Sequence, residues 1–329
     1  MVVLPIVFRR RAPLVAGQYA ATGAIRKPGG RCHAGGADPV RNSSLSWAGK
    51  APEAANPHRR ERKVRAVSPL VTLRQVTKVF PPARGGSPVH ALGPIDLDLR
   101  TGEFFAVVGP SGCGKSTLLE LIAGLSDATE GSIAFEGMPI AGNVPDGIGV
   151  VFQEDSCLPW RTVRANIELG LRKSPLSRAE QNTKVESVLE LMNLTEFARH
   201  YPAQLSGGMR QRVCIARTLV REPRLILLDE PFAALDQQTR LLMGEEVLRL
   251  WRAIGATVFL ITHALDEAAM LSDRIAVMSA RPGCILEIVE TGWPRERDSR
   301  ILEDERFGPT AAHLWRLLRG ETIRAADAR

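Results

Sequence analysis

Nine consecutive residues, GPSGCGKST from Gly109 to Thr117, have the composition of a phosphate-binding loop and fit the pattern GxxxxGK[ST]. Glycines let backbone N–H groups turn inward around phosphate oxygens, and a helix beginning at the end of the loop adds the positive end of its dipole. Lys115 can reach the β- and γ-phosphates of a nucleotide, and the Ser116 hydroxyl can ligate Mg²⁺. We expect every residue of the loop to contact the nucleotide: Gly109, Pro110, Ser111, Gly112, Cys113, Gly114, Lys115, Ser116 and Thr117.

The thiol of Cys113 is a second chemical feature of this loop. It lies near the start of the expected helix and close to Lys115, and both should lower the pKa of a thiol and favour the thiolate. We assign Cys113 no catalytic role.

Two carboxylates follow an apolar run further along the chain. The run is LILLDE, from Leu225 to Glu230, and its apolar part predicts a buried strand. Asp229 suits an outer contact to Mg²⁺, and Glu230 suits polarising the water that attacks a γ-phosphate. Buried strands often end in acidic residues, so this interpretation depends on the phosphate-binding loop in the same chain.

The elements that must position these residues alternate between strand and helix. Strands are predicted in LVTLRQVTKVF, IDLDLRTG, EFFAVVG, IGVVFQ, RLILLDE, ATVFLITH and RIAVMSA. Helices are predicted in STLLELIAGL, AEQNTKVESVLELMNL, MRQRVCIARTLVRE, TRLLMGEEVLRLWRAIG and ALDEAAMLSD. Glycines end two of these helices, at Gly124 and Gly255. The order predicts an α/β fold with a mostly parallel core sheet.

A second phosphate-binding element lies about 90 residues after the loop, in LSGGM from Leu205 to Met209. Ser206 and the backbone amides of Gly207 and Gly208 can bind a phosphate at the start of a helix. Ser206 can also cap that helix. The loop from Gly109 to Thr117 can hold the phosphates of one nucleotide by itself. This raises the question of which phosphate the LSGGM motif binds.

With these three motifs the chain resembles the ATP-binding subunit of an ABC transporter, over roughly Leu70 to Pro294. LSGGM is similar to the family signature LSGGQ, with Met209 replacing the final glutamine and its amide donor. The resemblance implies a P-loop NTPase fold of the ABC ATPase type, with a helical signature subdomain and an antiparallel β portion beside the core sheet. It implies ATP and Mg²⁺ as cofactors. It also implies a head-to-tail dimer, in which Ser206, Gly207 and Gly208 contact the γ-phosphate held by a second copy of the chain.

The same resemblance implies roles for four further residues. Gln153 resembles the Q-loop glutamine, which senses Mg²⁺ and the transmembrane partner, and Asp236 in FAALD resembles the D-loop aspartate at the dimer contact. His263 resembles the switch histidine that contacts the γ-phosphate. Phe80 resembles the aromatic residue that stacks on adenine, with packing in the core as the alternative. The expected catalytic residues are therefore Glu230, His263 and Gln153, and the expected metal-site residues are Ser116, Gln153 and Asp229.

The segment EDSCLPWRTVRANIELGL, residues 154–171, occupies the place where subunits of this family contact their membrane partner. Its Leu158, Pro159 and Trp160 resemble the branch that serves nitrate, sulfonate and taurine importers. The alternative is an ordinary hydrophobic surface loop. The resemblance implies transmembrane permease subunits as partners, a solute-binding protein as an indirect partner, and a peripheral position on the cytoplasmic face of the inner (plasma) membrane.

Charge and composition are uneven along the chain. Residues 1–65 hold 13 Lys and Arg and three acidic residues, a net charge of +10. The total net charge is +7, so the rest of the chain has a net charge of −3. We expect residues 1–67 to be a disordered basic tail; a dispensable tail, a start codon assigned too far upstream and an Arg-rich targeting peptide remain open. Residues 70–294 should form the ATPase domain and residues 295–329 a short helical tail.

Several other function classes fit the sequence less well. The basic charge lies in the tail and is poor evidence for nucleic acid, so we expect no nucleic-acid partner. Chromosome-acting relatives insert long coiled coils between the loop and the signature, ribosome-acting relatives carry two ATPase domains, and this chain has neither. Glu230 and His263 argue against a non-catalytic nucleotide-binding module. A different importer or exporter branch of the family remains the alternative.

The cysteines of the chain show no paired spacing. The chain has five cysteines, and none is spaced as CxxC. Their number and scatter argue against a disulfide framework or a zinc site and fit a reducing compartment.

Overall fold

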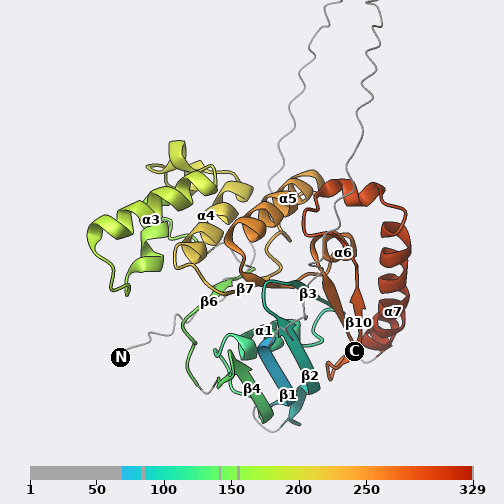
Figure 1. Cartoon of the computed structure of the whole chain (residues 1–329). Coiled ribbons are helices and arrows are strands. Elements are labelled where there is room, and N and C mark those ends of the chain that lie inside the picture. Colours follow the sequence, from blue (N-terminus) through green and yellow to red (C-terminus); the bar gives the residue numbers. More distant parts are fainter. Residues whose placement is uncertain (1–68, 83–85, 141, 154–155, 328–329) are drawn as a thin grey trace, which may run out of the picture. The chain divides into compact units, whose positions relative to one another are not determined.

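Two β-sheets and the helices around them make up the part of the chain that the computed structural model describes, residues 69–82, 86–140, 142–153 and 156–327 (Figure 1). These residues belong to one unit, residues 62–329. The expected basic tail, residues 1–67, lies outside the described residues.

The larger sheet is mostly parallel, as the alternation of elements predicts. Its strands lie in the order β10 (Ile285–Glu290), β9 (Arg274–Met278), β3 (Phe104–Val108), β8 (Thr257–Ile261), β7 (Leu225–Asp229) and β6 (Ile148–Val151). Neighbouring strands from β9 to β6 pair in parallel, and β10 pairs antiparallel at the edge. Parallel strands buried on both faces need apolar side chains throughout, which is why these segments are nearly continuous apolar runs.

The two faces of this sheet feed two different hydrophobic cores. In β3, Phe104 and Ala106 belong to one core, whereas Phe105 and Val107 belong to the other. This division follows from the two-residue period of a strand, in which successive side chains point to opposite faces.

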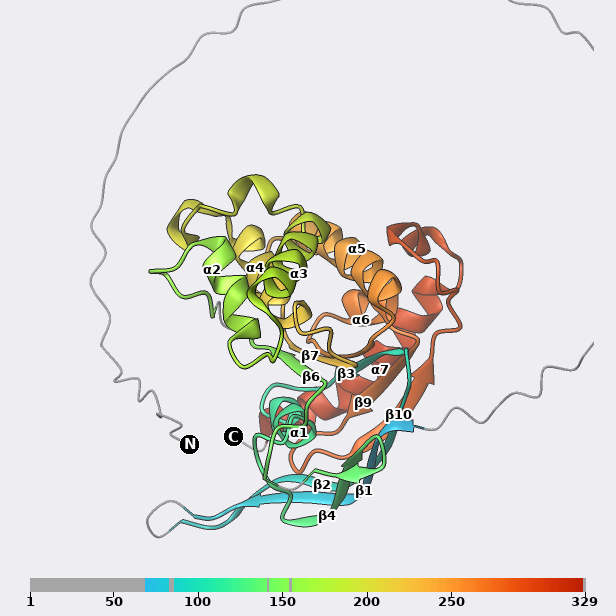
Figure 2. The same cartoon turned by 60° about the vertical axis from the view of Figure 1, so that its left-hand side comes forward.

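An antiparallel sheet covers one of these cores. Its strands lie in the order β2 (Val89–Arg100), β1 (Pro69–Phe80), β4 (Glu130–Phe135) and β5 (Met138–Pro139). Helix α1 (Lys115–Ile122) lies between the two sheets in both views and contacts β2, β7 and β8 (Figures 1 and 2). The antiparallel portion implied by the family resemblance is therefore present, and α1 with its preceding loop is held between two layers.

Helices cover the other face of the larger sheet (Figure 1). They are α2 (Val163–Glu168), α3 (Arg178–Leu191), α4 (Gly207–Leu219), α5 (Gln237–Ile254), α6 (Leu265–Leu271) and α7 (Phe307–Asp327), with the short 3₁₀ helices η1 (Leu169–Leu171), η2 (Thr195–Phe197), η3 (Pro202–Gln204) and η4 (Ser299–Glu303). Gly255 follows α5 with a φ of 70°, a left-handed conformation that glycine adopts without strain. Helices α2, α3 and α4 form the helical subdomain that carries the LSGGM motif.

The C-terminal segment, which we expected to be a short helical tail, contains a long helix that packs against the domain. Helix α7 has 21 residues and packs against α6 and β9. Its Phe307, Leu314 and Leu318 are buried in the same core as Phe104. These residues lie on one face of the helix because their spacing follows the helical period, so this core extends beyond residue 294.

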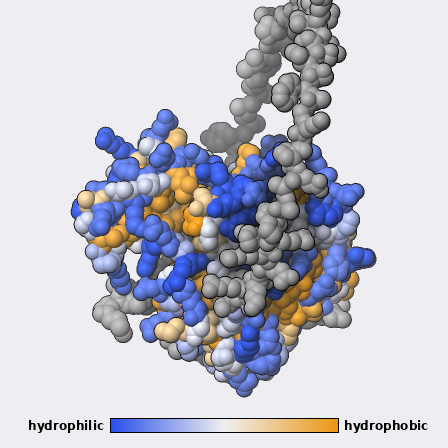
Figure 3. All heavy atoms as spheres, viewed as in Figure 1, coloured by the Kyte–Doolittle hydropathy of each residue, from blue (hydrophilic) through white to orange (hydrophobic). Residues whose placement is uncertain are grey.

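The polarity of the surface and of the helices bears on whether a helix could cross a membrane. Hydrophilic side chains cover much of the face seen in Figure 3. In the described part of the chain, every helix is too short or too polar to cross a bilayer.

Candidate functional site

The phosphate-binding loop connects the buried strand β3 to helix α1, as its sequence predicts. Lys115 folds back over the loop, where its Nζ donates hydrogen bonds to the carbonyl oxygens of Gly109 at 2.9 Å and Pro110 at 3.0 Å. Gly114 begins the helix with a φ of 107°, and a Cβ there would lie 2.5 Å from the Leu92 side chain. Only glycine fits this backbone conformation and this close approach.

Arg281 is a residue of this site that the sequence analysis did not identify. Its Nε and Nη2 donate to the carbonyl oxygen of Gly112, at 3.1 and 2.8 Å. The residue lies in the connection between β9 and β10, far from the loop in sequence. No spacing rule links the two, so only the pairing of β9 with β3 could bring them together.

Ser116 and Asp229 come together where Mg²⁺ is expected. The Ser116 hydroxyl donates to Asp229 Oδ1 at 3.3 Å, joining the start of α1 to the end of β7. Burial raises the pKa of Asp229; the hydrogen bond from Ser116 opposes this shift, and the charge of Glu230 adds to it. Mg²⁺ in nucleotide sites is held by one or two protein oxygens together with substrate phosphates, so this oxygen pair beside the loop fits the ion. When bound, Mg²⁺ would neutralise charge on the phosphates.

The three expected catalytic residues meet at one oxygen atom. Glu230 Oε2 accepts a hydrogen bond from Gln153 Nε2 at 3.2 Å and lies 3.2 Å from His263 Nδ1. Glu230 has a φ of 44°, a left-handed conformation that is strained for a residue with a side chain. Its N–H donates to the Ile261 carbonyl at the end of β8, which holds that conformation in place.

A cavity of about 400 Å³ opens beside the loop and is lined by Phe80 and by six of the nine loop residues. The residues that line it are Phe80, Val89, Ala91, Ser111, Gly112, Gly114, Lys115, Ser116, Thr117, Gln153, Glu230 and Arg281. Phe80 lines this cavity and is 38% exposed. Its side chain is therefore not packed in the core, which was the alternative to stacking on adenine. Lys78 Nζ lies 5.1 Å from the centre of the Phe80 ring, so one face of the ring is occupied by a cation.

The expectation for the Cys113 thiol was wrong. Its side chain is buried, and burial raises the pKa of the thiol more than the nearby Lys115 lowers it. The thiol turns into the protein and belongs to the hydrophobic core that also contains Leu118 and Met278. Sequence position near a helix start could not reveal this burial.

Nine predicted residues do not line this cavity: Gly109, Pro110, Cys113, Asp229, His263, Ser206, Gly207, Gly208 and Asp236. The last four lie at the starts of two helices. Ser206 caps α4, since its side chain accepts a hydrogen bond from the Met209 N–H at 3.3 Å. Asp236 caps α5 in the same way, accepting from the Thr239 N–H at 3.0 Å and from its hydroxyl at 2.6 Å. A Cβ on Gly208 would lie 3.6 Å from the Thr239 side chain, so these two helix starts are neighbours.

The predicted residues of these two helix starts, Ser206, Gly207, Gly208 and Asp236, are absent from the lining of the cavity that holds Lys115. Ser206, Gly207 and Asp236 are exposed. Met209, where the family signature has glutamine, packs its half-buried side chain against the core. The replacement therefore adds apolar contact behind an exposed Ser-Gly-Gly surface.

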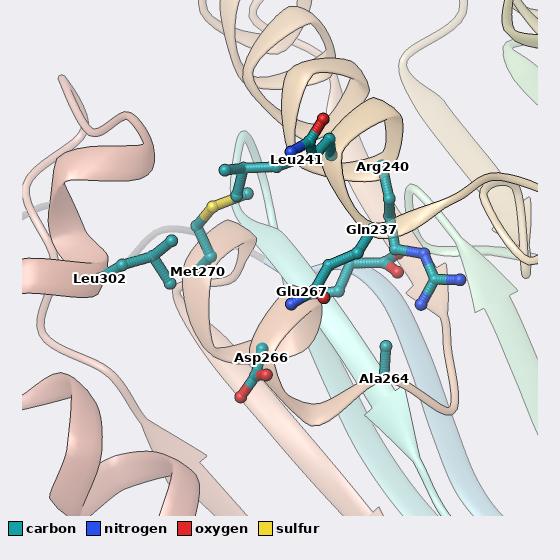
Figure 4. Close-up of a pocket in the computed structure, with 9 residues that line it drawn as sticks. Gln237, Arg240, Leu241, Ala264, Asp266, Glu267, Met270 and Leu302 are labelled. Carbon is teal, nitrogen blue, oxygen red and sulfur yellow. The ribbon is translucent and has the colours of Figure 1, made fainter.

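A buried carboxyl group supports the loop that carries His263. Glu267 Oε2 accepts a hydrogen bond from the Thr262 hydroxyl at 3.2 Å, and that hydroxyl oxygen accepts one from the Ala264 N–H at 3.0 Å. The residues on both sides of His263 are thus tied to Glu267. A second cavity, of about 580 Å³, lies here between α5 residues such as Arg240 and α6 (Figure 4).

Burial gives Glu267 a pH-dependent effect on stability. It raises the pKa of this carboxyl from 4.5 to about 7, with hydrogen bonding from Thr262 opposing the shift. The folded state therefore binds the proton more tightly than the unfolded state, and stability falls as the pH rises from about 4.5 to about 7. Each pH unit in this window costs at most about 1.4 kcal/mol.

We expect Glu267→Gln to remove this loss, because glutamine keeps an oxygen for Thr262 but cannot ionise. Relative to wild type, the variant should gain about 2–3 kcal/mol in the free energy of unfolding between pH 5 and pH 8. Urea unfolding at both pH values measures the gain. Asp266→Asn, an exposed carboxyl on the same helix, is the matched control. A wild-type-to-variant difference that is equal at both pH values would contradict the prediction.

The sequence of the chain is similar to those of known proteins. Residues 92–233 match the family model described as ABC transporter. The chain is 46% identical over 231 residues to an uncharacterized ABC transporter ATP-binding protein of Methanocaldococcus jannaschii, covering 70% of this chain and 85% of the relative. It is 45% identical over 237 residues to the nitrate import ATP-binding protein NrtD of Synechococcus elongatus, with the same two coverages.

A solved structure shares the fold as well. It is a dimeric ATP-binding cassette in a post-hydrolysis state bound to ADP and Pi, with a TM-score of 0.59 and 32% identity, over 68% of this chain and all of that chain. The family match spans the phosphate-binding loop, Gln153, the LSGGM motif and Glu230. With a loop for phosphates, an oxygen pair for Mg²⁺ and a carboxylate held by Gln153 and His263, this chain belongs to the ABC transporter family as an ATP-hydrolysing subunit.

Proposed function

We propose that this chain energises the import of nitrate, or of an organic sulfonate such as taurine, through a separate membrane permease. The observation that carries the proposal is the 45% identity to a nitrate import ATP-binding protein over 85% of that protein's length. The chain would act peripherally at the cytoplasmic face of the inner membrane, with a solute-binding protein as an indirect partner.

In this proposal two copies of the chain close head to tail on two ATP molecules. Each ATP lies in the cavity beside Lys115, with its adenine against Phe80 and its phosphates in the loop. Ser206, Gly207 and Gly208 of the other copy complete the γ-phosphate site, which is consistent with their absence from the cavity lining of their own chain. Asp236 lies beside them, at the dimer contact.

Hydrolysis then depends on the group of residues around Glu230. Its carboxylate accepts a hydrogen bond from the attacking water and orients it in line with the γ-phosphate. Gln153 and His263 now contact Glu230 Oε2, and both would turn toward the metal site and the γ-phosphate when ATP is bound. Lys115 would exchange its two carbonyl partners for phosphate oxygens, a charge-assisted contact that is stronger than the one it leaves.

The permease contact is supported by a rigid exposed loop. Trp160 is 72% exposed, whereas Asn166 behind it is fully buried. Asn166 accepts a hydrogen bond from the Leu158 N–H at 2.8 Å and donates to the carbonyl oxygens of Leu158, Arg161 and Thr162, at 3.2, 3.0 and 3.0 Å. A large aromatic side chain on a preorganised loop is typical of residues that anchor protein interfaces.

Reconstitution tests the proposal. The chain is assembled in vesicles with the permease and solute-binding protein encoded beside it, and ATP hydrolysis is measured with nitrate, taurine or no solute. We expect nitrate or taurine to stimulate hydrolysis several-fold, and Trp160→Ala to abolish that stimulation because the permease loses its anchor. Trp315→Ala, another exposed tryptophan at 60% exposure on α7, is the matched control. Stimulation by neither solute would overturn the assignment to this importer branch.

A further inference from the structure

Two cysteines that lie 57 residues apart in the sequence come into direct contact. The Sγ atoms of Cys157 and Cys214 are 3.4 Å apart. Cys157 belongs to the segment that leads to Trp160 and is half-buried, whereas Cys214 is buried on α4. The pair therefore joins the proposed permease-contact loop to the helix that begins at the LSGGM motif.

The surroundings of the pair favour a thiolate. The Ser156 hydroxyl donates to Cys214 Sγ at 3.8 Å, and Arg217 donates to the Ser156 carbonyl at 2.8 Å and to its hydroxyl. The hydrogen bond from Cys157 is the main cause that lowers the pKa of Cys214 to about 7, with Ser156 and Arg217 also lowering it and burial opposing them. A large fraction of this thiol is thus ionised at neutral pH.

The other described cysteines have different environments. Cys113 is buried, and its thiol pKa is raised. Cys284 donates its S–H to the Gly93 carbonyl at 2.8 Å. Among the cysteines of the described residues, Cys157 and Cys214 are the two whose sulfurs are recorded in contact.

We propose that Cys157 and Cys214 form a modification site for peroxides, at which the two thiols are oxidised to a reversible disulfide that inhibits ATP hydrolysis. A disulfide has an S–S length of about 2.05 Å, so the sulfurs need to approach by about 1.4 Å. The half-buried Cys157 can meet the oxidant, and the buried Cys214 can resolve the product.

The chemistry balances with hydrogen peroxide as the oxidant. Cys157 loses its proton and attacks one peroxide oxygen; an S–O bond forms, the O–O bond breaks, and the departing hydroxide takes that proton and leaves as water. The Cys214 thiolate then attacks the sulfur of the Cys157 sulfenic acid. The S–S bond forms, the S–O bond breaks, and the departing hydroxide leaves as water with a proton from the solvent, which balances the proton that Cys214 released when it ionised. Two thiols and one peroxide give one disulfide and two water molecules.

The disulfide should affect hydrolysis because Cys157 follows Gln153 closely in the chain. Gln153 lies four residues before Cys157 and contacts Glu230 at 3.2 Å, so we expect a movement of Cys157 toward α4 to disturb the Glu230 group. The same movement should also displace Ser156 and its contacts to Arg217. The inhibition rests on the proposed catalytic role of the Glu230 group, whereas formation of the disulfide does not.

Peptide mapping tests the disulfide. The reduced full-length chain is treated with graded hydrogen peroxide, its remaining thiols are blocked, and it is digested with trypsin. We expect peptide 213–217 linked to peptide 116–161, with the loss of two hydrogen atoms and full release by dithiothreitol. Cys157→Ser and Cys214→Ser should each lack the linked peptide, whereas Cys284→Ser, the matched control, should keep it. Oxidation of these cysteines only to sulfinic or sulfonic acids, or a link to another cysteine, would overturn the site.

ATP hydrolysis by the same samples tests the inhibition. Wild type should lose most of its rate in step with the linked peptide, for example tenfold at full linkage, and regain it with dithiothreitol. Cys157→Ser should keep its own untreated rate under the same peroxide. A fully linked chain that hydrolyses ATP at the reduced rate would refute inhibition while leaving the disulfide in place. A chain that is inactive even when reduced would count instead against the proposed function.

Discussion

Glu230→Gln abolishes steady ATP hydrolysis and leaves ATP binding intact; this is the result that we expect from the contacts of Glu230. Glutamine has nearly the same shape and keeps an oxygen for Gln153 and the backbone bond to Ile261. It lacks the negative charge that, in the proposed function, orients the attacking water and accepts its proton. General-base groups contribute about 10²–10⁴-fold to a rate, so the rate should fall by at least about 100-fold.

Two measurements separate this role from a structural one. Nucleotide binding by the variant should stay within about twofold of wild type, and with ATP the variant should accumulate as a dimer, because the closed state no longer resets. Glu120→Gln, which neutralises an exposed carboxylate on α1, is the matched control and should keep the wild-type rate. Turnover by Glu230→Gln within a few fold of wild type would remove Glu230 from the mechanism.

Ser206→Arg should also stop hydrolysis, but through the partner copy. The new side chain would fill the space where the Ser-Gly-Gly surface meets the γ-phosphate of the other chain, so transition-state charge would go unstabilised. ATP binding by the isolated chain should remain nearly normal because Lys115 and the loop are untouched. Loss of the helix cap costs about 1 kcal/mol by itself.

Ser177→Arg is the matched control for that cap. Ser177 caps α3 as Ser206 caps α4, accepting a hydrogen bond from the Glu180 N–H at 3.3 Å. Both variants should lose similar stability, and only Ser206→Arg should lose hydrolysis. If Ser177→Arg were equally inactive, the effect would come from the helix caps rather than from the phosphate contact.

Mixed dimers decide between action within one chain and action across the dimer. A dimer of one Ser206→Arg chain and one Lys115→Ala chain places both changes at the same composite site and leaves the other site complete. A dimer with both changes in one chain damages both sites. The first should hydrolyse ATP faster than the second. The ATP affinity of the isolated Ser206→Arg chain is also compared with that of the isolated Lys115→Ala chain. An equally large loss of affinity would show instead that the LSGGM motif acts on the nucleotide bound by the same chain.

The loop and the acidic strand end could be predicted from the sequence because their chemistry is local. GPSGCGKST specifies glycines, a lysine and a hydroxyl within nine residues, and LILLDE specifies a buried strand that ends in carboxylates. The helix caps at Ser206 and Asp236 are also local, since each acceptor and its donor are three residues apart. The parallel sheet followed from apolar runs that alternate with helices.

Contacts between distant residues were decided by the tertiary structure. Arg281 reaches Gly112 because β9 pairs with β3, and the Cys113 thiol is buried because its loop packs against a hydrophobic core. The C-terminal helix enters the core because one face of α7 meets α6 and β9. Each of these three contacts depends on which helices and strands lie next to one another in the fold. The local periodicity of the sequence does not specify these neighbours.

The cysteines show the same division most clearly. In the sequence they are scattered and odd in number, which argues against a disulfide framework. Folding places α4 against the segment before Trp160, and this brings Cys157 and Cys214 to 3.4 Å and lowers the pKa of one thiol. The sequence by itself thus determined the residue types and the local geometry of the nucleotide chemistry. The packing of separate elements determined which side chains share an environment, because contact distance and burial arise only when the chain is folded.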